Sequence, residues 1–201
     1  MSEQLERQLQ DHLTATAAVG DLIPDVTKLA AEICERLGRG ATLYTFGNGG
    51  SAADAQHLAA ELVGRYLRDR RPLAAVALST DPSVTTCIAN DYSYASVFSR
   101  QVTALVKPDD VVVGFSTSGT SPSVVEGLAA ARKAGALTVM LTGERGAGVA
   151  ADRVLVVPSP STARVQEGHV LLLHMLSELI DQWAASPESA GGPVEQDAVA
   201  L

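Results

Sequence analysis

The sequence predicts an α/β fold, a three-layer α-β-α sandwich built around a five-stranded parallel sheet. Five short segments are nearly continuous runs of apolar, β-forming residues, a pattern typical of strands that are buried on both faces. Alanine-rich stretches with helical periodicity separate these segments, so strands and helices alternate. Hydrophobic residues make up 46% of the 201 residues and charged residues 19%, which supplies enough apolar material for one core.

The elements follow in order along the chain. Two helices are expected first, over residues 3–19 and 23–37, because Gly20-Asp21 offers a turn and a cap and Pro24 suits a first helical turn. Strands are predicted at residues 41–46, 73–79, 110–115, 137–142 and 153–157. The clearest helices between them span 51–67 and 121–134, and the longest helix, over 162–183, follows the last strand.

This order divides the chain into three parts. Residues 1–38 hold the N-terminal helices, and residues 39–185 form the α/β domain. Residues 186–201 are rich in Ser, Pro, Gly, Ala and acidic residues. Because this tail has no apolar face to bury, we expect it to be disordered.

Charge and cysteine content exclude several classes of protein. Lys plus Arg is 15 and Asp plus Glu is 23, which gives a net charge of −8. Proteins that bind nucleic acid through its phosphate backbone are usually basic, so nucleic acid is not an expected partner. Cys34 and Cys87 cannot form a disulfide framework or a cysteine-based zinc site, and we expect two reduced, partly buried thiols. No signal-peptide order and no membrane-spanning apolar run is present, so we expect a soluble, cytoplasmic protein without a membrane partner.

Two polar loops follow predicted strands. Residues 47–51, the glycine loop, read Gly-Asn-Gly-Gly-Ser and open a helix, whose N–H groups favour an anion, although a tight turn alone also needs glycine. Residues 116–121, the hydroxyl loop, read Ser-Thr-Ser-Gly-Thr-Ser and resemble a phosphate cradle without a permanent positive charge; a capped Ser/Thr-rich turn is the alternative. Because the carboxyl ends of parallel strands meet at one edge, the two loops are expected to share a crevice.

Four polar side chains stand on the helices beside these loops. His57 and Glu61 lie one turn apart on a shared face, an arrangement that is also common as a surface pair. In the last helix, Gln166 and His174 interrupt an apolar stretch about 80° apart around the axis, so they can border one groove. A histidine there can also be a hydrogen-bonded core residue, and His169, which lies further round the helix, is interpreted as structural.

The motifs together resemble the phosphoheptose isomerases of the sugar isomerase (SIS) superfamily. The resemblance covers the chain from the N-terminal helices to about Trp183. It is carried, in order, by Phe46-Gly-Asn-Gly-Gly-Ser51, Asp54-Ala-Gln-His57, Glu61-Leu-Val-Gly-Arg-Tyr66, Asn90-Asp91, Ser116-Thr-Ser-Gly-Thr-Ser121 and Arg164-Val-Gln-Glu167 with His174. The implied fold is the SIS fold, and residues 39–185 become a sugar-phosphate isomerase domain.

The resemblance also implies site residues and an assembly. One Zn²⁺ per subunit is expected, held by His57, Glu61, Gln166 and His174. The residues expected around the sugar phosphate are Asn48, Gly49, Gly50, Ser51, Glu61, Asn90, Asp91, Ser116, Thr117, Ser118, Ser121 and Gln166. Family members assemble as tetramers with active sites at subunit contacts, so residues 1–38 are expected to mediate oligomerisation.

The implied reaction converts D-sedoheptulose 7-phosphate to D-glycero-D-manno-heptose 7-phosphate through an enediol or enediolate, with Glu61 and His174 as base and acid. One position departs from the family: Ala163 stands where many members have an aspartate ahead of the arginine. The stretch around it also resembles a non-catalytic relative that binds the replication initiator DnaA. The alternatives are therefore a non-catalytic SIS tetramer that binds DnaA, and an SIS isomerase for another sugar phosphate.

Overall fold

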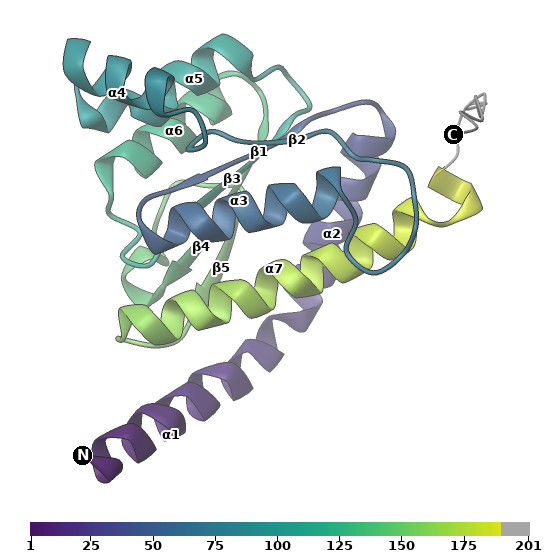
Figure 1. Ribbon diagram of the computed structural model, residues 1–201. Helices are drawn as coiled ribbons and strands as arrows, with labels where there is room; N and C mark the ends of the chain where they lie inside the picture. Colours follow the sequence, from purple (N-terminus) through teal and green to yellow (C-terminus); the bar gives the residue numbers. More distant parts are fainter. Residues whose placement is uncertain (190–201) are drawn as a thin grey trace, which may run out of the picture.

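The computed structural model describes residues 1–189 and has the predicted α/β architecture (Figure 1). Five strands form one parallel sheet in the order β2-β1-β3-β4-β5. The strands are β1 (Leu43–Gly47), β2 (Ala75–Ala77), β3 (Val111–Ser116), β4 (Leu137–Gly143) and β5 (Arg153–Val157). The helices are α1 (Ser2–Val19), α2 (Ile23–Gly38), α3 (Gly50–Val63), α4 (Pro82–Asp91), α5 (Val97–Leu105), α6 (Pro122–Lys133) and α7 (Thr162–Ala184), with 3₁₀ turns η1 (Gly20–Leu22), η2 (Tyr94–Ser96), η3 (Glu144–Gly146) and η4 (Pro187–Ser189).

Helices cover both faces of the sheet. One core lies between the sheet and α2, α3 and α7, and a second lies between the sheet and α4, α5 and α6 (Figure 1). In β3 the side chains alternate between the two, since Val111 and Val113 join the first core and Val112 joins the second. Both faces of the strand are therefore apolar, which is why the strands read as continuous hydrophobic runs. The predicted fold class is confirmed.

Two predicted elements are shorter than expected. The strand predicted over 73–79 is only β2, at an edge of the sheet, where Val76 is 42% exposed and pairing is limited to one neighbour. The helix predicted over 51–67 is α3, which ends at Val63 because Gly64 leaves the helical conformation (φ −78°, ψ −107°). Residues 64–74 instead form a loop that lies against α7, an arrangement the local sequence did not predict.

The crossover from β2 to β3 contains two helices that the sequence reasoning did not specify. α4 begins with Pro82 after Asp81, whose carboxylate accepts hydrogen bonds from the next free N–H groups. Cys87 lies on α4 and is exposed, so the expectation of a partly buried thiol is wrong there, whereas Cys34 is buried. Of the tail predicted to be disordered, residues 190–201 lie outside the described part of the chain.

The helix α1 extends from the sheet layers and contacts the beginning of α7 (Figure 1). His12 of α1 bonds through Nδ1 to the Glu167 carboxylate at 2.7 Å. On α1, Leu5, Leu9 and Leu13 recur every four residues and are 62%, 59% and 52% exposed. A stripe of this kind is an unpartnered apolar face. Within residues 1–189, no helix has both the length and the apolar character needed to cross a bilayer.

The other end of α7 is fastened to the end of α2. The indole of Trp183 packs against Gly38, where a side-chain methyl would lie 3.4 Å from the ring. The guanidinium of Arg71 lies 5.4 Å from the centroid of the same indole, a cation–π contact. Trp183 therefore marks the place where α2, α7 and the 64–74 loop meet.

Candidate active site

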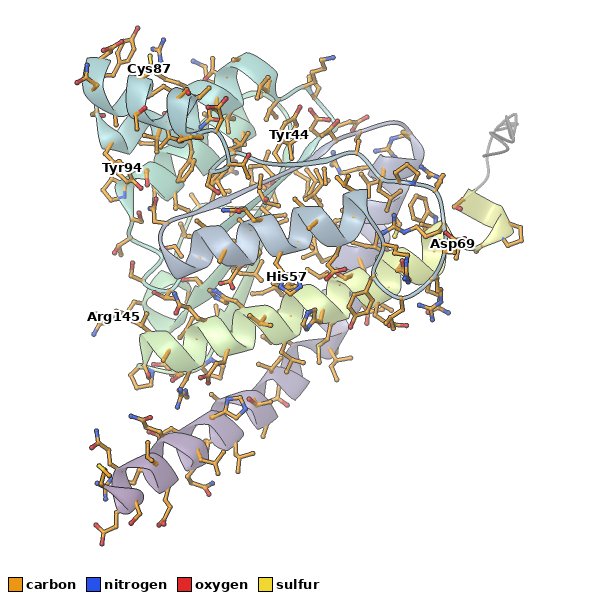
Figure 2. The ribbon with its side chains drawn as sticks, viewed as in Figure 1. Tyr44, His57, Asp69, Cys87, Tyr94 and Arg145 are labelled. Carbon is orange, nitrogen blue, oxygen red and sulfur yellow. The ribbon has the colours of Figure 1, made fainter. Side chains whose placement is uncertain are left out.

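The glycine loop and the hydroxyl loop lie side by side at the carboxyl end of the sheet, because β1 and β3 are neighbours. Asn48 joins them, since its side-chain amide donates to the hydroxyls of Ser121 at 2.8 Å and Ser123 at 2.9 Å. Tyr94, from η2, donates its own hydroxyl to the Asn48 amide oxygen at 2.8 Å (Figure 2). The two loops form one polar surface. Tyr94 was not predicted, because nothing in its local sequence indicates that it reaches Asn48.

The hydroxyl loop is preorganised by its own hydrogen bonds. Ser116 is buried, and its hydroxyl accepts from the backbone N–H of Gly119 at 3.2 Å. The Ser118 hydroxyl accepts from the N–H of Thr120 at 3.3 Å. Ser121 occupies the N-cap position of α6, but its side chain makes no capping hydrogen bond and instead accepts from Asn48. These bonds fix the loop before any anion arrives, which lowers the entropy lost on binding.

An arginine and a glutamate, Arg145 and Glu144 of η3, also line a cavity at this loop. Thr117 and Ser118 line a small cavity of about 80 Å³ together with Arg145 of η3. The sequence reasoning expected a cradle without a permanent positive charge, so Arg145 is an addition from the structure. It was missed because residues after β4 meet the hydroxyl loop only in the folded sheet.

The structure brings His57, Glu61 and His174 together. Figure 2 shows His57 between α3 and α7. His57 Nε2 lies 2.9 Å from Glu61 Oε1 and 3.4 Å from His174 Nε2. The two imidazole rings meet edge to face, with centroids 4.9 Å apart. All three side chains are half-buried, and one ligand atom from each lies within 4.8 Å of the others. This group, the His–Glu–His cluster, contains both candidate proton-transfer residues.

The donor atoms of the His–Glu–His cluster fit a zinc ion. Two ligands at ~2.0–2.1 Å from a tetrahedral zinc lie about 3.4 Å apart. The two imidazole nitrogens match this separation, and the Glu61 oxygen is slightly nearer to His57. The same separation allows one N–H···N hydrogen bond between the rings, which a shared cation would replace. The chemistry of the set, two imidazoles and a carboxylate, is that of a catalytic zinc site with an open position.

Gln166 lies elsewhere within the same chain. It precedes His174 by eight residues, or ~12 Å along the helix axis. Its side-chain amide packs against Gly50 so closely that a side-chain methyl at Gly50 would lie 2.4 Å from Nε2. The structure therefore brings three of the four expected metal ligands together and places the fourth at the glycine loop. A role for Gln166 in metal binding stays a prediction, whereas its position suits contact with substrate.

Asn90 and Asp91 lie at the end of α4 and are exposed. The Asn90 amide donates to the Asp91 carboxylate at 2.8 Å, and Cys87 Sγ also contacts that carboxylate at 3.5 Å. In the described residues, neither Asn90 nor Asp91 bonds to the glycine loop or the hydroxyl loop. Gly49, at the turn of the glycine loop, has φ +57°, and Ser51 is buried at the start of α3.

Known proteins resemble this chain along most of its length. The sequence profile of the SIS domain family matches residues 9–143. A phosphoheptose isomerase from Geotalea daltonii is 45% identical over 185 residues, covering 90% of this chain and 96% of that protein. A probable phosphoheptose isomerase from Thermoplasma acidophilum is 49% identical over 162 residues, covering 80% and 89%. The solved phosphoheptose isomerase GmhA from Neisseria gonorrhoeae is 40% identical, covers 90% and 98% of the two chains, and has a TM-score of 0.83. The chain belongs to the phosphoheptose isomerase family.

As a member of the phosphoheptose isomerase family, the chain is an aldose–ketose isomerase that acts on a sugar phosphate. The interpretation as a non-catalytic SIS protein is not supported, because these relatives are enzymes and the His–Glu–His cluster is assembled. Ala163, the departure from the family pattern, is exposed in the first turn of α7. No carboxylate replaces it at that position.

One further carboxyl group, that of Asp54, lies beside the His–Glu–His cluster. Asp54 stands one turn before His57 on α3 and is 8% exposed. Its Oδ2 atom has no hydrogen-bond partner among the described residues. Burial raises the pKa of Asp54 to about 6, against an opposing effect of His57. Nothing in the local sequence indicates a role for Asp54 beyond its place in the Asp54-Ala-Gln-His57 motif.

His169 lies on the buried side of α7, in an unusual environment. The side chain is fully buried, its ring lies edge-on to Phe115 with centroids 5.9 Å apart, and neither ring nitrogen has a hydrogen-bond partner among residues 1–189. Burial lowers the pKa of His169 to about 4. His169 is therefore neutral inside the fold at neutral pH.

The buried imidazole predicts an acid limb of stability. Below pH 6.5 His169 is protonated in the unfolded chain, whereas in the folded chain it stays neutral until about pH 4. The free energy of unfolding therefore falls as the pH drops from 6.5 to 4. The loss of stability from His169 reaches about 3 kcal/mol near pH 4. His169→Leu should remove it. Urea denaturation at pH 7 and pH 4.5 measures how much stability the wild type and His169→Leu each lose. Asp54 titrates in both proteins, so its opposing effect cancels when the two losses are compared. Equal losses would contradict the assignment.

Proposed function

We propose that this protein converts D-sedoheptulose 7-phosphate to D-glycero-D-manno-heptose 7-phosphate in the cytoplasm, assisted by a zinc ion. The observation that carries the proposal is the assembled cluster of His57 and Glu61, on the helix α3 that begins at the glycine loop, with His174 of α7. Along α3, His57 lies seven residues from Gly50, or ~10 Å. In a seven-carbon sugar 7-phosphate the reacting carbons, C1 and C2, lie at the opposite end of the chain from the phosphate. Such a substrate suits the distance between the glycine loop and His57.

The loops anchor the substrate in this proposal. The hydroxyls of Thr117, Ser118 and Ser121 and the free N–H groups of the adjoining helix suit a phosphate group. Arg145 offers a positive charge at the same cavity, which Glu144 also lines. Gln166, packed against Gly50, can hydrogen-bond the sugar hydroxyls between the two ends. Binding energy from the phosphate positions the reacting carbons, which do not contact the anion site.

Glu61 and His174 move the protons. The Glu61 carboxylate takes a proton from C1 of the open-chain ketose, and the electron pair forms the C1–C2 double bond of an enediol as O2 gains a proton. Return of a proton to C2 and loss of the O1 proton give the aldose, with His174 exchanging protons with the two oxygens. Zinc held by His57, Glu61 and His174 would stabilise negative charge on those oxygens.

The experiment that tests this function is direct. Purified protein, with and without added Zn²⁺, is incubated with sedoheptulose 7-phosphate, and the aldose product is followed by NMR. We expect conversion that depends on zinc and is lost with a chelator. Parallel incubations with shorter ketose phosphates separate this function from isomerisation of another sugar phosphate. Turnover of a shorter sugar alone, or no product under any condition, would overturn the proposal.

We also propose a homotetramer with active sites shared between subunits. The exposed stripe of Leu5, Leu9 and Leu13 needs an apolar partner. An apolar groove of about 400 Å³ beside His174, lined in part by Ile23 of α2, opens at the same side of the molecule as the N-terminal helices. A second copy of the chain can cover both surfaces, which would enclose His174.

A charge on the α1 stripe should therefore break the assembly. Leu9→Glu is expected to convert the tetramer to smaller species in light scattering after size exclusion, and to lower isomerisation at least tenfold because the shared site is opened. Gln10→Glu adds the same charge beside the stripe and should leave the mass unchanged. A Leu9→Glu protein with the wild-type mass would contradict this surface.

A further inference from the structure

We propose that Asp181 and Arg70 form a positioning pair that sets the orientation of His174 and Glu61. The proposal rests on the proposed function, since it matters only if these two side chains do chemistry. The pair lies outside the His–Glu–His cluster and touches none of its donor atoms. It acts through two structures that it holds: the end of α3, just after Glu61, and the 64–74 loop, which carries Tyr66 to the ring of His174.

Asp181 is the anchor on α7. It follows His174 by seven residues, two turns along the same face. Its side chain is fully buried and accepts hydrogen bonds from the backbone N–H groups of Tyr66 (3.4 Å), Leu67 (3.3 Å) and Arg68 (2.8 Å). Three consecutive backbone donors on one carboxylate fix the course of the loop as well as its distance from α7.

Arg70 joins this carboxylate to α3. Its side chain is 1% exposed, and Nε donates to Asp181 at 3.1 Å. The two terminal nitrogens donate to four backbone carbonyl oxygens, among them those of Glu61 (2.6 Å), Leu62 (2.8 Å) and Gly64 (3.1 Å). A guanidinium is planar and always charged, so it can donate hydrogen bonds to the free carbonyl groups at the end of a helix and bind a carboxylate at the same time. The pair thus links the backbone of Glu61 to the helix of His174.

Tyr66 transmits the position of the loop to the candidate acid. Its ring lies over His174, with centroids 5.7 Å apart and planes tilted by 30°. His174 is held on its other side by the edge of the His57 ring. Rotation of the imidazole is therefore limited by two rings, one of which is placed by Asp181 through the N–H of Tyr66 itself.

The structure offers matched variants. Asp181→Asn keeps the shape of the side chain but turns one acceptor oxygen into a donor that faces N–H groups. Tyr66→Leu leaves the buried pair intact and removes the ring over His174. Glu178→Gln is the control. Glu178 is 38% exposed and bonds to the Arg68 guanidinium, whose same nitrogen lies 3.4 Å from Asp181, but it bonds directly to neither Asp181, Arg70 nor Tyr66 in the described residues.

We expect Asp181→Asn and Tyr66→Leu each to lower kcat 10- to 100-fold, the usual effect of losing a group that orients a metal ligand or catalytic side chain. KM for the sugar phosphate should change less than threefold, because the glycine and hydroxyl loops are not contacted. Glu178→Gln should change kcat less than twofold. A fall in kcat for Asp181→Asn alone, or a parallel rise in KM, would overturn the positioning role and leave only a structural anchor.

A second readout does not depend on turnover. In metal-free protein, the imidazole resonances of His174 should shift in Asp181→Asn and in Tyr66→Leu but not in Glu178→Gln. The amide protons of Tyr66, Leu67 and Arg68 should exchange faster in Asp181→Asn. If the wild type fails to isomerise any sugar phosphate, the proposed function fails while these spectra still test the pair. Unshifted His174 resonances in folded Tyr66→Leu would overturn the inference.

Discussion

Replacing Glu61 by glutamine is expected to lower the isomerisation rate about 10³-fold and leave the fold unchanged. The side chain is 20% exposed and bonds to His57 at 2.9 Å, a contact that glutamine can keep through its amide. The substitution removes only the negative charge that accepts the C1 proton. Since the sugar phosphate is anchored at the loops, KM should change much less than kcat.

The control for this variant is Glu126→Gln, on the exposed side of α6, which should keep the wild-type rate. Zinc content measured on the same preparations distinguishes the two roles of Glu61. A variant that retains zinc but not turnover assigns Glu61 to proton transfer, and loss of both assigns it to metal binding. Turnover within tenfold of the wild type would remove Glu61 from either role.

The second large effect is expected at Gly119 of the hydroxyl loop. Gly119 has φ +66°, and a side-chain methyl there would lie 2.2 Å from the Cα atom of Gly146 in η3. Neither backbone can retreat without moving a strand end, so Gly119→Ala combines an unfavourable dihedral angle with a backbone collision. We expect a loss of about 2–4 kcal/mol in the free energy of unfolding. KM for the sugar phosphate should also rise, since the loop must shift.

Chemical denaturation with a matched glycine variant checks this value. Gly20, between α1 and α2, has helical dihedral angles (φ −54°, ψ −34°) and open space around it. Gly20→Ala should therefore be neutral or stabilise the protein by up to about 1 kcal/mol. A Gly119→Ala protein within 0.5 kcal/mol of the wild type, on the order of a surface substitution, would show that the loop is not held against η3.

The sheet and its loops could be predicted because their signals are local. Strands buried on both faces read as unbroken apolar runs, and glycine or hydroxyl residues after β1 and β3 mark the ligand edge of a parallel sheet. The pairing of His57 with Glu61 follows from helical spacing alone. The meeting of this pair with His174 was expected from family resemblance, and the packing of α3 on α7 produces it.

What was missed depends on contacts between distant segments. Arg70 and Asp181 read as ordinary charged residues, since neither sits in a motif and they are far apart along the chain. Residues 64–67 of the 64–74 loop have the sequence of a helix end, because nothing in that sequence indicates the Asp181 carboxylate that binds their backbone. Gln166 faces Gly50 because the first turns of α7 pack against the start of α3. The angles between residues within α7 cannot predict this contact with another helix.

Trp183 is the only tryptophan in the chain, so any change in intrinsic fluorescence that it dominates reports one junction. That junction joins the end of α2, the end of α7 and the 64–74 loop through Arg71. Circular dichroism, by contrast, averages over every helix. Coincident melting curves from the two signals would show that the junction separates in the same cooperative event as the sheet, and an earlier fluorescence change would show that it opens first.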